Sequence, residues 1–367
     1  MADSHAALVS QPQTARKRTV SQINVSCYKP AMALPILLDM DNACSIPAAD
    51  VDDALALALA LASPEVELVA CTASAGNCLA RESYAVTRHM LMLAERPDIP
   101  LGLGPDNPLR RDRWPHFAHL DAKRRESGCE LWDNAPAIGI PDKYPPDTSA
   151  ADVIIAAVRN HPGELVIVAT GSLTNVALAL QQAPEIAAEL NGIFHMGGAW
   201  PVEPGEEQWE NATPDIPPEI WRDVLRFNPL YDPEATEIVL HCGAAVTFMP
   251  ANVTMQTCLT EDALPVPGPE ASAFSRFLHE TCLPWIRWSR TQRGIPGMHL
   301  HDPLALAAAF RPELFHFREM SVDMSILLRP DGNFLTDVPT IPSCRCAVAV
   351  DEKAFLKLFG ERILAMF

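Results

Sequence analysis

The sequence predicts an α/β fold, a single domain with a mainly parallel central sheet flanked by helices and a Rossmann-like core. Two observations lead to this prediction. From residue 34 onward, short apolar runs typical of buried strands alternate with helical patterns, and such alternation indicates βαβ units. Hydrophobic residues also make up 48% of the 367 residues, enough to fill a large core. No change in composition requires a second domain.

The predicted elements follow in order along the chain. Continuous apolar runs predict strands at 34–38, 66–72, 165–169 and 192–196. Apolar residues at helical spacing predict helices at 52–62, 80–94, 174–182, 270–293, 302–310 and 352–367. Parallel sheets bind ligands at the carboxyl ends of their strands, so polar residues at those ends are the candidate functional residues.

Three segments fall outside this alternation. Residues 1–33 are mostly polar, and we expect a flexible N-terminal tail before a catalytic domain at 34–367. The segments 105–148 and 200–231 are long and rich in proline, as functional lids or insertions often are. The first of these contains a basic cluster: Arg110, Arg111, Arg113, Lys123, Arg124 and Arg125.

Composition excludes several classes of partner. The chain has 46 acidic and 28 basic residues and a net charge of −18, which argues against a nucleic acid polymer. It leaves a small anionic ligand or a carboxylate-bound metal open. The longest apolar run, 54–62, is too short to span a membrane. Ten scattered cysteines without a CxxC pair, and no secretory signal, predict a cytoplasmic protein.

Four carboxylates gather early in the predicted fold. Asp39 and Asp41 end the first strand, and Asp52 and Asp53 begin the next helix. Such a group is repulsive unless a cation neutralises it, and oxygen ligands suit Ca²⁺ or Mg²⁺. The alternative is helix capping, with Asp50 or Asp52 as the N-cap and Asp39 at a solvated strand end.

Other polar groups recur where the sheet would hold a ligand. Together with the carboxylates they make a set that resembles the inosine-uridine preferring nucleoside hydrolase family. Seven motifs occur in the family's order over about residues 34–366: Asp39-Met-Asp41 with Asp52-Asp53, Ala75-Gly-Asn77, Thr170-Gly-Ser-Leu-Thr-Asn175, Met196-Gly-Gly198, Phe227-Asn228, Asp232-Pro-Glu-Ala235 and His301-Asp302-Pro303. The resemblance implies a nucleoside hydrolase-like fold that forms homodimers or homotetramers and cleaves ribonucleosides to ribose and free base.

The same resemblance implies a Ca²⁺ cofactor and a role for each matching residue. Asp41 would be the general base on a Ca²⁺-bound water, and His301 would assist departure of the base. The metal ligands would be Asp41, Asp53, the Thr170 carbonyl and Asp302. The contacts to substrate would come from Asp52, Asn77, Met196, Asn211, Arg226 and Asn228. For His301, the alternative is a core histidine beside a helix start.

Three features depart from the family pattern. Ten residues, 42–51, separate Asp41 from the Asp52-Asp53 pair where the family has three. This insertion of seven affects the metal loop, and Asp50 within it could replace Asp41. Arg226 stands where the family has a glutamate that contacts the ribose 5′-hydroxyl. The basic cluster, with His116 and His119, replaces a His-Gly-rich motif.

These departures leave alternatives open. A guanidinium suits phosphate, so the substrate could be a 5′-phosphorylated nucleoside or another ribosyl phosphate bound by Arg226. Arg226 could instead turn outward or pair with Asp223. A haloacid-dehalogenase-type phosphatase with Asp39 as nucleophile is a different enzyme class, but a suitably placed lysine and later Asp pair are missing. A non-catalytic nucleoside-binding protein is the third reading.

Overall fold

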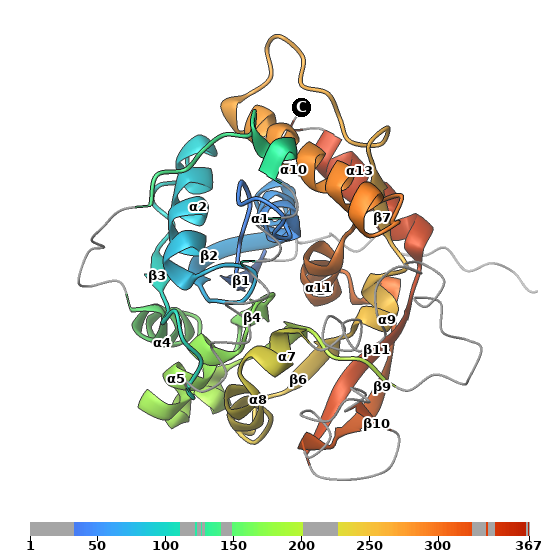
Figure 1. The fold of residues 1–367 in the computed structure, drawn as a ribbon. Coiled ribbons are helices and arrows are strands. Elements are labelled where there is room, and N and C mark those ends of the chain that lie inside the picture. Colours follow the sequence, from blue (N-terminus) through green and yellow to red (C-terminus); the bar gives the residue numbers. More distant parts are fainter. Residues whose placement is uncertain are drawn as a thin grey trace, which may run out of the picture. The chain divides into compact units, whose positions relative to one another are not determined.

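The computed structural model describes residues 33–110, 122, 126, 129–140, 149–200, 227–324, 335–336, 342–364 and 366. Within Ala33–Phe367, which forms one compact unit, helices surround a central sheet (Figure 1). Residues 1–32 and most of the two proline-rich segments lie outside the described residues. The predicted tail therefore stays a prediction.

Nine strands of the described chain form the sheet, in the order β10-β9-β11-β6-β5-β4-β1-β2-β3. Their bounds are β1 Leu34–Met40, β2 Val66–Ala73, β3 Leu101–Leu103, β4 Val166–Ala169, β5 Gly192–Met196, β6 Val246–Met249, β9 Phe315–Val322, β10 Leu335–Thr336 and β11 Ser343–Val350. All pairings from β3 to β11 are parallel, whereas β9 pairs antiparallel with both β11 and β10. A mainly parallel sheet is thus confirmed. A separate antiparallel pair joins β7 (Cys258–Thr260) to β8 (Gly297–His299).

The predicted helices form within three residues of their expected ends. The longer helices are α1 Asp52–Ala62, α2 Ala80–Leu93, α4 Ala150–Asn160, α5 Thr174–Gln182, α8 Pro233–Leu240, α10 Ala273–Gln292, α11 His301–Phe310 and α13 Glu352–Leu364. The short helices are η2 Cys129–Trp132, η3 Pro184–Glu189, α7 Phe227–Tyr231, α9 Ala251–Thr254 and η4 Pro312–Leu314. No helix in the described ranges has the length and hydropathy needed to cross a lipid bilayer.

Strands β3-β2-β1-β4-β5-β6 follow the order of doubly wound sheets, in which the chain winds outward in both directions from the centre. Alternation along β1 separates two cores: Ile36 and Leu38 face one, and Leu37 faces the other. Helices α1, α2, α10, α11 and α13 cover the first face, and α4, α5 and α8 cover the second. The topological switch lies between β1 and β4, and doubly wound sheets bind their ligands at the carboxyl ends of the strands at this point.

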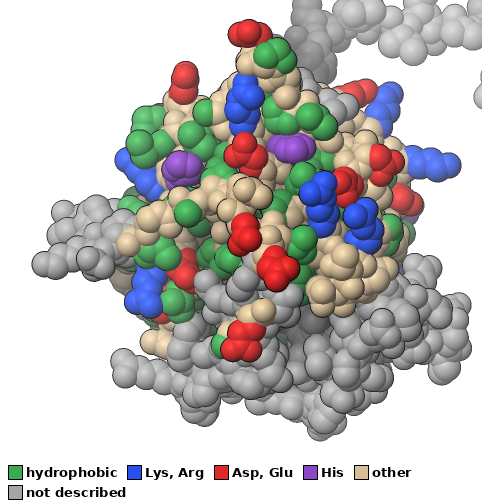
Figure 2. Space-filling model, turned by 45° about the horizontal axis from the view of Figure 1, so that its top comes forward, with side chains coloured by type: hydrophobic (Ala, Val, Ile, Leu, Met, Phe, Trp, Pro, Cys, Tyr) green, Lys and Arg blue, Asp and Glu red, His purple; other side chains and the backbone are tan. Residues whose placement is uncertain are grey.

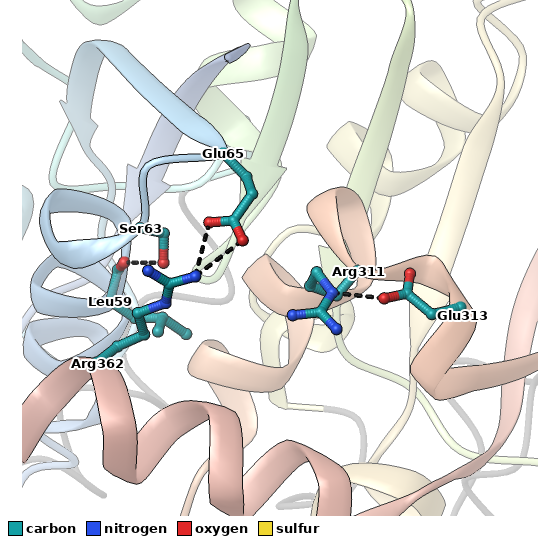
Figure 3. A network of polar contacts seen from close by, with 6 residues as sticks. All are labelled: Leu59, Ser63, Glu65, Arg311, Glu313 and Arg362. Atoms are coloured by element: carbon teal, nitrogen blue, oxygen red, sulfur yellow. Dashed lines mark hydrogen bonds and ion pairs between the residues drawn. The ribbon is translucent and has the colours of Figure 1, made fainter. Parts of the chain in front are cut away.

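The C-terminal helix α13 is held mainly by apolar packing. Phe355 and Phe359 are buried in the first core. Figure 3 shows Arg362 reaching Glu65, which follows α1, with N···O distances of 2.8 and 3.1 Å. This partly exposed ion pair contributes at most about 1 kcal/mol, whereas each buried aromatic ring contributes about 2 kcal/mol or more.

Charges of both signs lie interspersed on the face drawn in Figure 2. Among the ion pairs of the described residues, Glu261 pairs with Arg287 at 2.7 Å and with Arg290 at 3.2 Å, both on α10. These two arginines are about half exposed, so their pairs contribute little to stability. The positive charges of these two arginines on α10 are therefore exposed to solvent but paired with the Glu261 carboxylate.

Asp232 joins three segments near the carboxyl edge of the sheet. It is fully buried, and its Oδ1 accepts the Ala235 N–H at the start of α8. Its Oδ2 accepts from Thr174 Oγ1 at 2.7 Å and from the Leu109 N–H at 2.8 Å. The Asp232-Pro-Glu-Ala motif is therefore a helix cap that also anchors α5 and the loop before residue 110.

Replacing Asp232 with Ala should lower the free energy of unfolding by about 3 kcal/mol, because three donors lose their acceptor in a buried place. Ser272→Ala removes the simpler N-cap of α10 and should cost about 1 kcal/mol. Urea unfolding of both variants measures the difference. Equal losses would contradict the anchoring role of Asp232.

Candidate active site

The end of β1 is buried, and its first carboxylate is a structural link. Asp39 is 0% exposed, and its Oδ1 accepts from Thr72 Oγ1 and from Asn175 Nδ2, both at 2.7 Å. Its backbone carbonyl accepts the Thr170 N–H at 2.8 Å. The interpretation of Asp39 as a solvated strand end is therefore wrong, because β2 and the β4–α5 loop close over it.

Asp41 and Asp53 approach one another at the switch point. Asp41 Oδ2 accepts the backbone N–H of Asn77 at 2.6 Å, and Asp53 Oδ1 accepts from Thr170 Oγ1 at 2.6 Å. The other oxygen of each carboxylate is buried without a hydrogen-bond partner. Two carboxylates thus present unused oxygen atoms inside the protein.

Glycines allow the loops to approach this closely. A Cβ atom at Gly76 would lie 2.1 Å from Asp41 Oδ2, and one at Gly171 would lie 2.4 Å from Ser74 Oγ. Both distances are too short for any side chain. The glycines of the Ala75-Gly-Asn77 and Thr170-Gly motifs are therefore required by packing against the carboxylates.

The starts of α1 and α11 meet beside this pair of carboxylates. Both helices are rich in Ala and Leu and buried on nearly all sides, so they pack closely. This packing brings the Asp302 N–H to 2.9 Å from Asp52 Oδ2, although the two residues are 250 positions apart. Carboxylate oxygens of Asp52, Asp53 and Asp302 lie within 4.8 Å of one another.

The helix-capping interpretation of the same residues is wrong. Val51 is the N-cap of α1, and no side chain caps the helix there. Asp52 and Asp53 are 2% and 0% exposed, so they point into the protein. Asp50 accepts the N–H of Val51 and is half-buried.

Burial makes ionisation of these carboxyl groups costly. It raises the pKa of Asp39 to about 7 and that of Asp41 to about 6. Burial, and then the neighbouring acids, raise the pKa of Asp52, Asp53 and Asp302 well above the usual range. The unpartnered oxygens and this mutual repulsion both fit a cation site, because a bound cation would satisfy the oxygens and favour the ionised forms.

Asn228, on the short helix α7, contacts the ends of β4 and β5. Its Nδ2 donates to the carbonyl oxygens of Thr170 and, at 3.0 Å, of Met196. Its Oδ1 is buried without a partner. Because one hydrogen bond uses only one lone pair of the Thr170 carbonyl, that oxygen keeps the capacity for a second ligand.

His301 lies at the start of α11, next to Asp302. Its Nδ1 is 2.7 Å from Thr254 Oγ1, and its ring centroid is 5.4 Å from that of His299. His299 Nδ1 contacts the Thr257 carbonyl at 2.9 Å. Burial lowers the pKa of His299 to about 4 and that of His301 well below its usual range. Sequence reasoning missed Thr254, Thr257 and His299; the alternation His299-Leu-His301 was the available signal.

The seven-residue insertion is packed, not loose. Cys44 and Ala48 are fully buried, and Cys44 Sγ lies 2.9 Å from Thr281 Oγ1 on α10. Asn42 Nδ2 donates to Thr87 Oγ1 on α2 at 3.3 Å. Asp41 keeps its contact with Asn77, and the charge of Asp50 raises the pKa of Asp52. The alternative in which Asp50 replaces Asp41 stays a prediction.

Asn211 and Arg226 lie outside the described residues, as do His116, His119 and all of the basic cluster except Arg110. Arg110 is exposed and lies 3.4 Å from Glu234. The roles predicted for Asn211 and Arg226 stay predictions.

In the metal-free protein, stability should rise when the pH falls from about 8 to about 6.5. Burial raises the pKa of Asp39 to about 7 and that of Asp41 to about 6 in the folded state, whereas the pKa of an unfolded aspartate is about 4. Between these values the folded state binds protons that the unfolded chain has released. The gain is about 1.4 kcal/mol per pH unit for each proton held. Below this window His195 and His299, with pKa values lowered to about 4, oppose the trend.

Urea unfolding with EDTA across this window measures the effect. Added Ca²⁺ should raise stability most at the alkaline end and so flatten the curve, since it favours the ionised carboxylates. Metal-free stability that stays constant or falls as the pH drops from 8 to 6.5 would contradict the buried-cluster account.

Comparison with known proteins identifies the family. The family model for inosine-uridine preferring nucleoside hydrolases matches residues 36–357. The pyrimidine-specific ribonucleoside hydrolase RihA of Salmonella paratyphi A is 31% identical over 342 residues, covering 90% of this chain and 99% of that protein. RihA of Escherichia coli O7:K1 is also 31% identical, over 346 residues with the same coverage.

Solved structures agree in fold. The plant nucleoside hydrolase PpNRh1 aligns with a TM-score of 0.69 and 28% identity, covering 90% of this chain and 99% of that one. The purine-preferring ribonucleoside hydrolase from Gardnerella vaginalis aligns with a TM-score of 0.68 and 29% identity, covering 90% and 98%. The phosphatase interpretation is therefore wrong, because the match extends over both halves of the chain. This protein belongs to the inosine-uridine preferring nucleoside hydrolase family and is an N-glycosyl hydrolase of the nucleoside hydrolase type.

Proposed function

We propose that this protein hydrolyses the N-glycosidic bond of ribonucleosides with Ca²⁺ as cofactor and releases ribose and a free base. The observation that carries the proposal is the buried carboxylate cluster with unpartnered oxygens at the carboxyl ends of β1 and β4. Residues of several family motifs contact one another here: Asn77 bonds to Asp41, Thr170 to Asp53, and Asn228 to the Thr170 carbonyl. Oxygen donors favour Ca²⁺ or Mg²⁺, and a site crowded with carboxylates and a backbone carbonyl suits the larger, less demanding ion.

The ligands in this proposal are Asp41, Asp53, Asp302 and the carbonyl oxygen of Thr170. Asp53 Oδ2 and Asp41 Oδ1 support it because each is buried without another partner. When bound, Ca²⁺ would supply positive charge that holds the ribose hydroxyls and lowers the pKa of a water. Asp52 lies within the same 4.8 Å group, and we assign it to a ribose hydroxyl.

Asp41 would act as the general base. Its Oδ2 is fixed by the Asn77 N–H, which leaves Oδ1 to take a proton from the attacking water. A carboxylate with a pKa of about 6 is a better proton acceptor near neutral pH than an ordinary aspartate. Cleavage proceeds with positive charge on the ribose, and the surrounding carboxylates would stabilise that charge.

The remaining assignments surround the ribose and the base. Asn77 and Asn228 would bind ribose hydroxyls, and Asn228 is oriented for this by its two donated hydrogen bonds. Met196 would lie beside the ribose, and Asn211 would contact its 5′ end. His301 would assist departure of the base, since its Nδ1 is anchored on Thr254 and its other nitrogen remains for the base.

A second candidate substrate, a 5′-phosphorylated nucleoside or another ribosyl phosphate, rests on Arg226. In the sequence, Arg226 directly precedes Phe227-Asn228, and the Asn228 side chain bonds to the Thr170 carbonyl. An arginine one residue before that helix could bind a phosphate at the ribose 5′ end.

Assembly and location are further parts of the proposal. We expect a homodimer or homotetramer, as the resemblance implies, and a cytoplasmic protein. The second expectation is supported by eight free cysteines among the described residues, six of which are buried inside the fold.

Release of reducing sugar from inosine and uridine tests the main proposal. EDTA should abolish cleavage and Ca²⁺ should restore it. Asp41→Asn should lower kcat by about 10³-fold while leaving the fold intact, because the base is lost. Asp98→Asn, a change of the same kind at an exposed residue, is the control. Full activity in EDTA, or an Asp41→Asn enzyme as active as the control, would disprove the mechanism.

Arg226→Glu tests the phosphate alternative on the matched pairs inosine with IMP and uridine with UMP. If Arg226 binds phosphate, the variant should lose about 10- to 100-fold in kcat/KM on the nucleotides and gain relative preference for the nucleosides. Arg222→Glu makes the same charge change four residues earlier and is the control. An unchanged preference between nucleotide and nucleoside would rule out the phosphate role.

A further inference from the structure

The short helix α9 and the turn after it contact two histidines. Thr254 Oγ1 lies 2.7 Å from His301 Nδ1, and the Thr257 carbonyl oxygen lies 2.9 Å from His299 Nδ1. The first partner is a hydroxyl, which can donate a hydrogen bond, whereas the second is a carbonyl, which can only accept one. The two histidines are therefore held by chemically different groups.

Thr254 is fixed within the fold. It is 0% exposed, its N–H donates to the Pro250 carbonyl at 3.1 Å, and its carbonyl accepts from Thr257 Oγ1 at 3.1 Å. Asn252, on the same helix, both donates to and accepts from the backbone of Trp200. A β-branched side chain also has few rotamers. The Thr254 hydroxyl is therefore held in place beside the start of α11.

The hydrogen of a buried hydroxyl needs an acceptor. Among the described residues, the only hydrogen-bond partner of Thr254 Oγ1 is His301 Nδ1. The hydroxyl hydrogen therefore points to Nδ1, which must offer its lone pair. An imidazole that accepts through Nδ1 is neutral and carries its hydrogen on Nε2.

His299 is the opposite tautomer. Because the Thr257 carbonyl only accepts, the hydrogen of His299 is on Nδ1 and its Nε2 is an acceptor. That Nε2 is buried without a hydrogen-bond partner. His301 is only half-buried, and its Nε2 has no hydrogen-bond partner in the part of the chain that the structure describes. Of these two histidines, His301 is the one with an N–H to offer a ligand.

We propose that Thr254 is a positioning residue for departure of the base: its hydroxyl holds His301 as the neutral tautomer whose Nε2–H donates a hydrogen bond to the leaving base. The inference rests on the proposed N-glycosidic cleavage and on the role assigned there to His301, and it deepens both. It points to bases that depart as anions with an accepting ring nitrogen or carbonyl oxygen, such as uracil and hypoxanthine.

The step balances with a neutral histidine. The C1′–N bond breaks with its electron pair on the base nitrogen, and the oxygen of water bonds to C1′. One proton of that water passes to Asp41 and from there to solvent. His301 stabilises the base anion through its Nε2–H and keeps that hydrogen, as a neutral imidazole can. The base takes one proton from solvent, so nucleoside and water give ribose and neutral base.

Ribosides with different leaving groups, assayed in Ca²⁺, test the inference. Uridine and inosine have poor leaving groups, whereas 4-nitrophenyl riboside releases a stable anion that needs little help. Thr254→Val keeps the shape but removes the hydroxyl, so it should lower kcat on both nucleosides by about 10-fold and on 4-nitrophenyl riboside by less than about 2-fold. Thr254→Ser keeps the hydroxyl and should restore most of the loss.

Thr247→Val is the matched control. Thr247 is 3% exposed, and its hydroxyl accepts from Arg345 Nε at 3.0 Å, not from a histidine. This variant also loses a buried threonine hydroxyl, so it should show no selectivity among the three ribosides.

The tautomer itself can be observed by ¹⁵N NMR of histidine-labelled protein in Ca²⁺, with His301→Gln to assign the signals. The wild-type spectrum should show His301 with its hydrogen on Nε2, and Thr254→Val should reduce the population of that tautomer. A structural role alone would not move this signal. A wild-type His301 with its hydrogen on Nδ1 would overturn the inference.

The kinetic outcomes separate the two proposals. Wild-type protein that cleaves none of the three ribosides would overturn the proposed function, and with it the role of Thr254 in departure of the base. Active wild-type protein would overturn the inference alone if Thr254→Val lost the same factor on all three substrates, or lost nothing. A loss confined to the nucleosides and restored by Thr254→Ser supports both.

Discussion

Five carboxyl groups buried at the switch point between β1 and β4 are the constraint on which the rest of the structure depends. Each buried charge costs several kcal/mol unless it is paired or satisfied. The surrounding motifs compensate part of this cost with donors: Thr72 and Asn175 on Asp39, the Asn77 N–H on Asp41, and Thr170 on Asp53. The oxygens that remain unsatisfied define where a cation fits.

The sheet order and the helix packing bring these carboxyl groups together. A doubly wound sheet brings the ends of β1, β2 and β4 to one edge, so short loops with glycine can approach the carboxylates closely. The packing of α1 on α11, two helices built from Ala and Leu, adds Asp302 from far along the chain. Asp232 stabilises the same edge from the other face by joining α5 to α8.

The carboxylate cluster and the surroundings of His301 are built from different parts of the fold. The carboxylates lie at the end of β1 and at the starts of α1 and α11, whereas His299 ends β8 and the insertion packs against α2 and α10. Relatives similar to this chain are described as pyrimidine-specific in one case and purine-preferring in another. If the carboxylates hold the ribose, as proposed above, the preference for a base depends on other residues, such as those around His301.

The sequence by itself determined the periodic elements, the parallel sheet and the family, because apolar periodicity and motif order are local properties of the chain. Strands β3, β6, β9, β10 and β11 of the sheet were not predicted. In β9, which pairs with both β10 and β11, buried and exposed residues do not alternate regularly. Only the tertiary structure decided that Asp39 is buried, that Val51 and not an aspartate caps α1, and that the insertion packs against α10. These features depend on contacts between residues tens to hundreds of positions apart, which the close packing of helices on a twisted sheet creates.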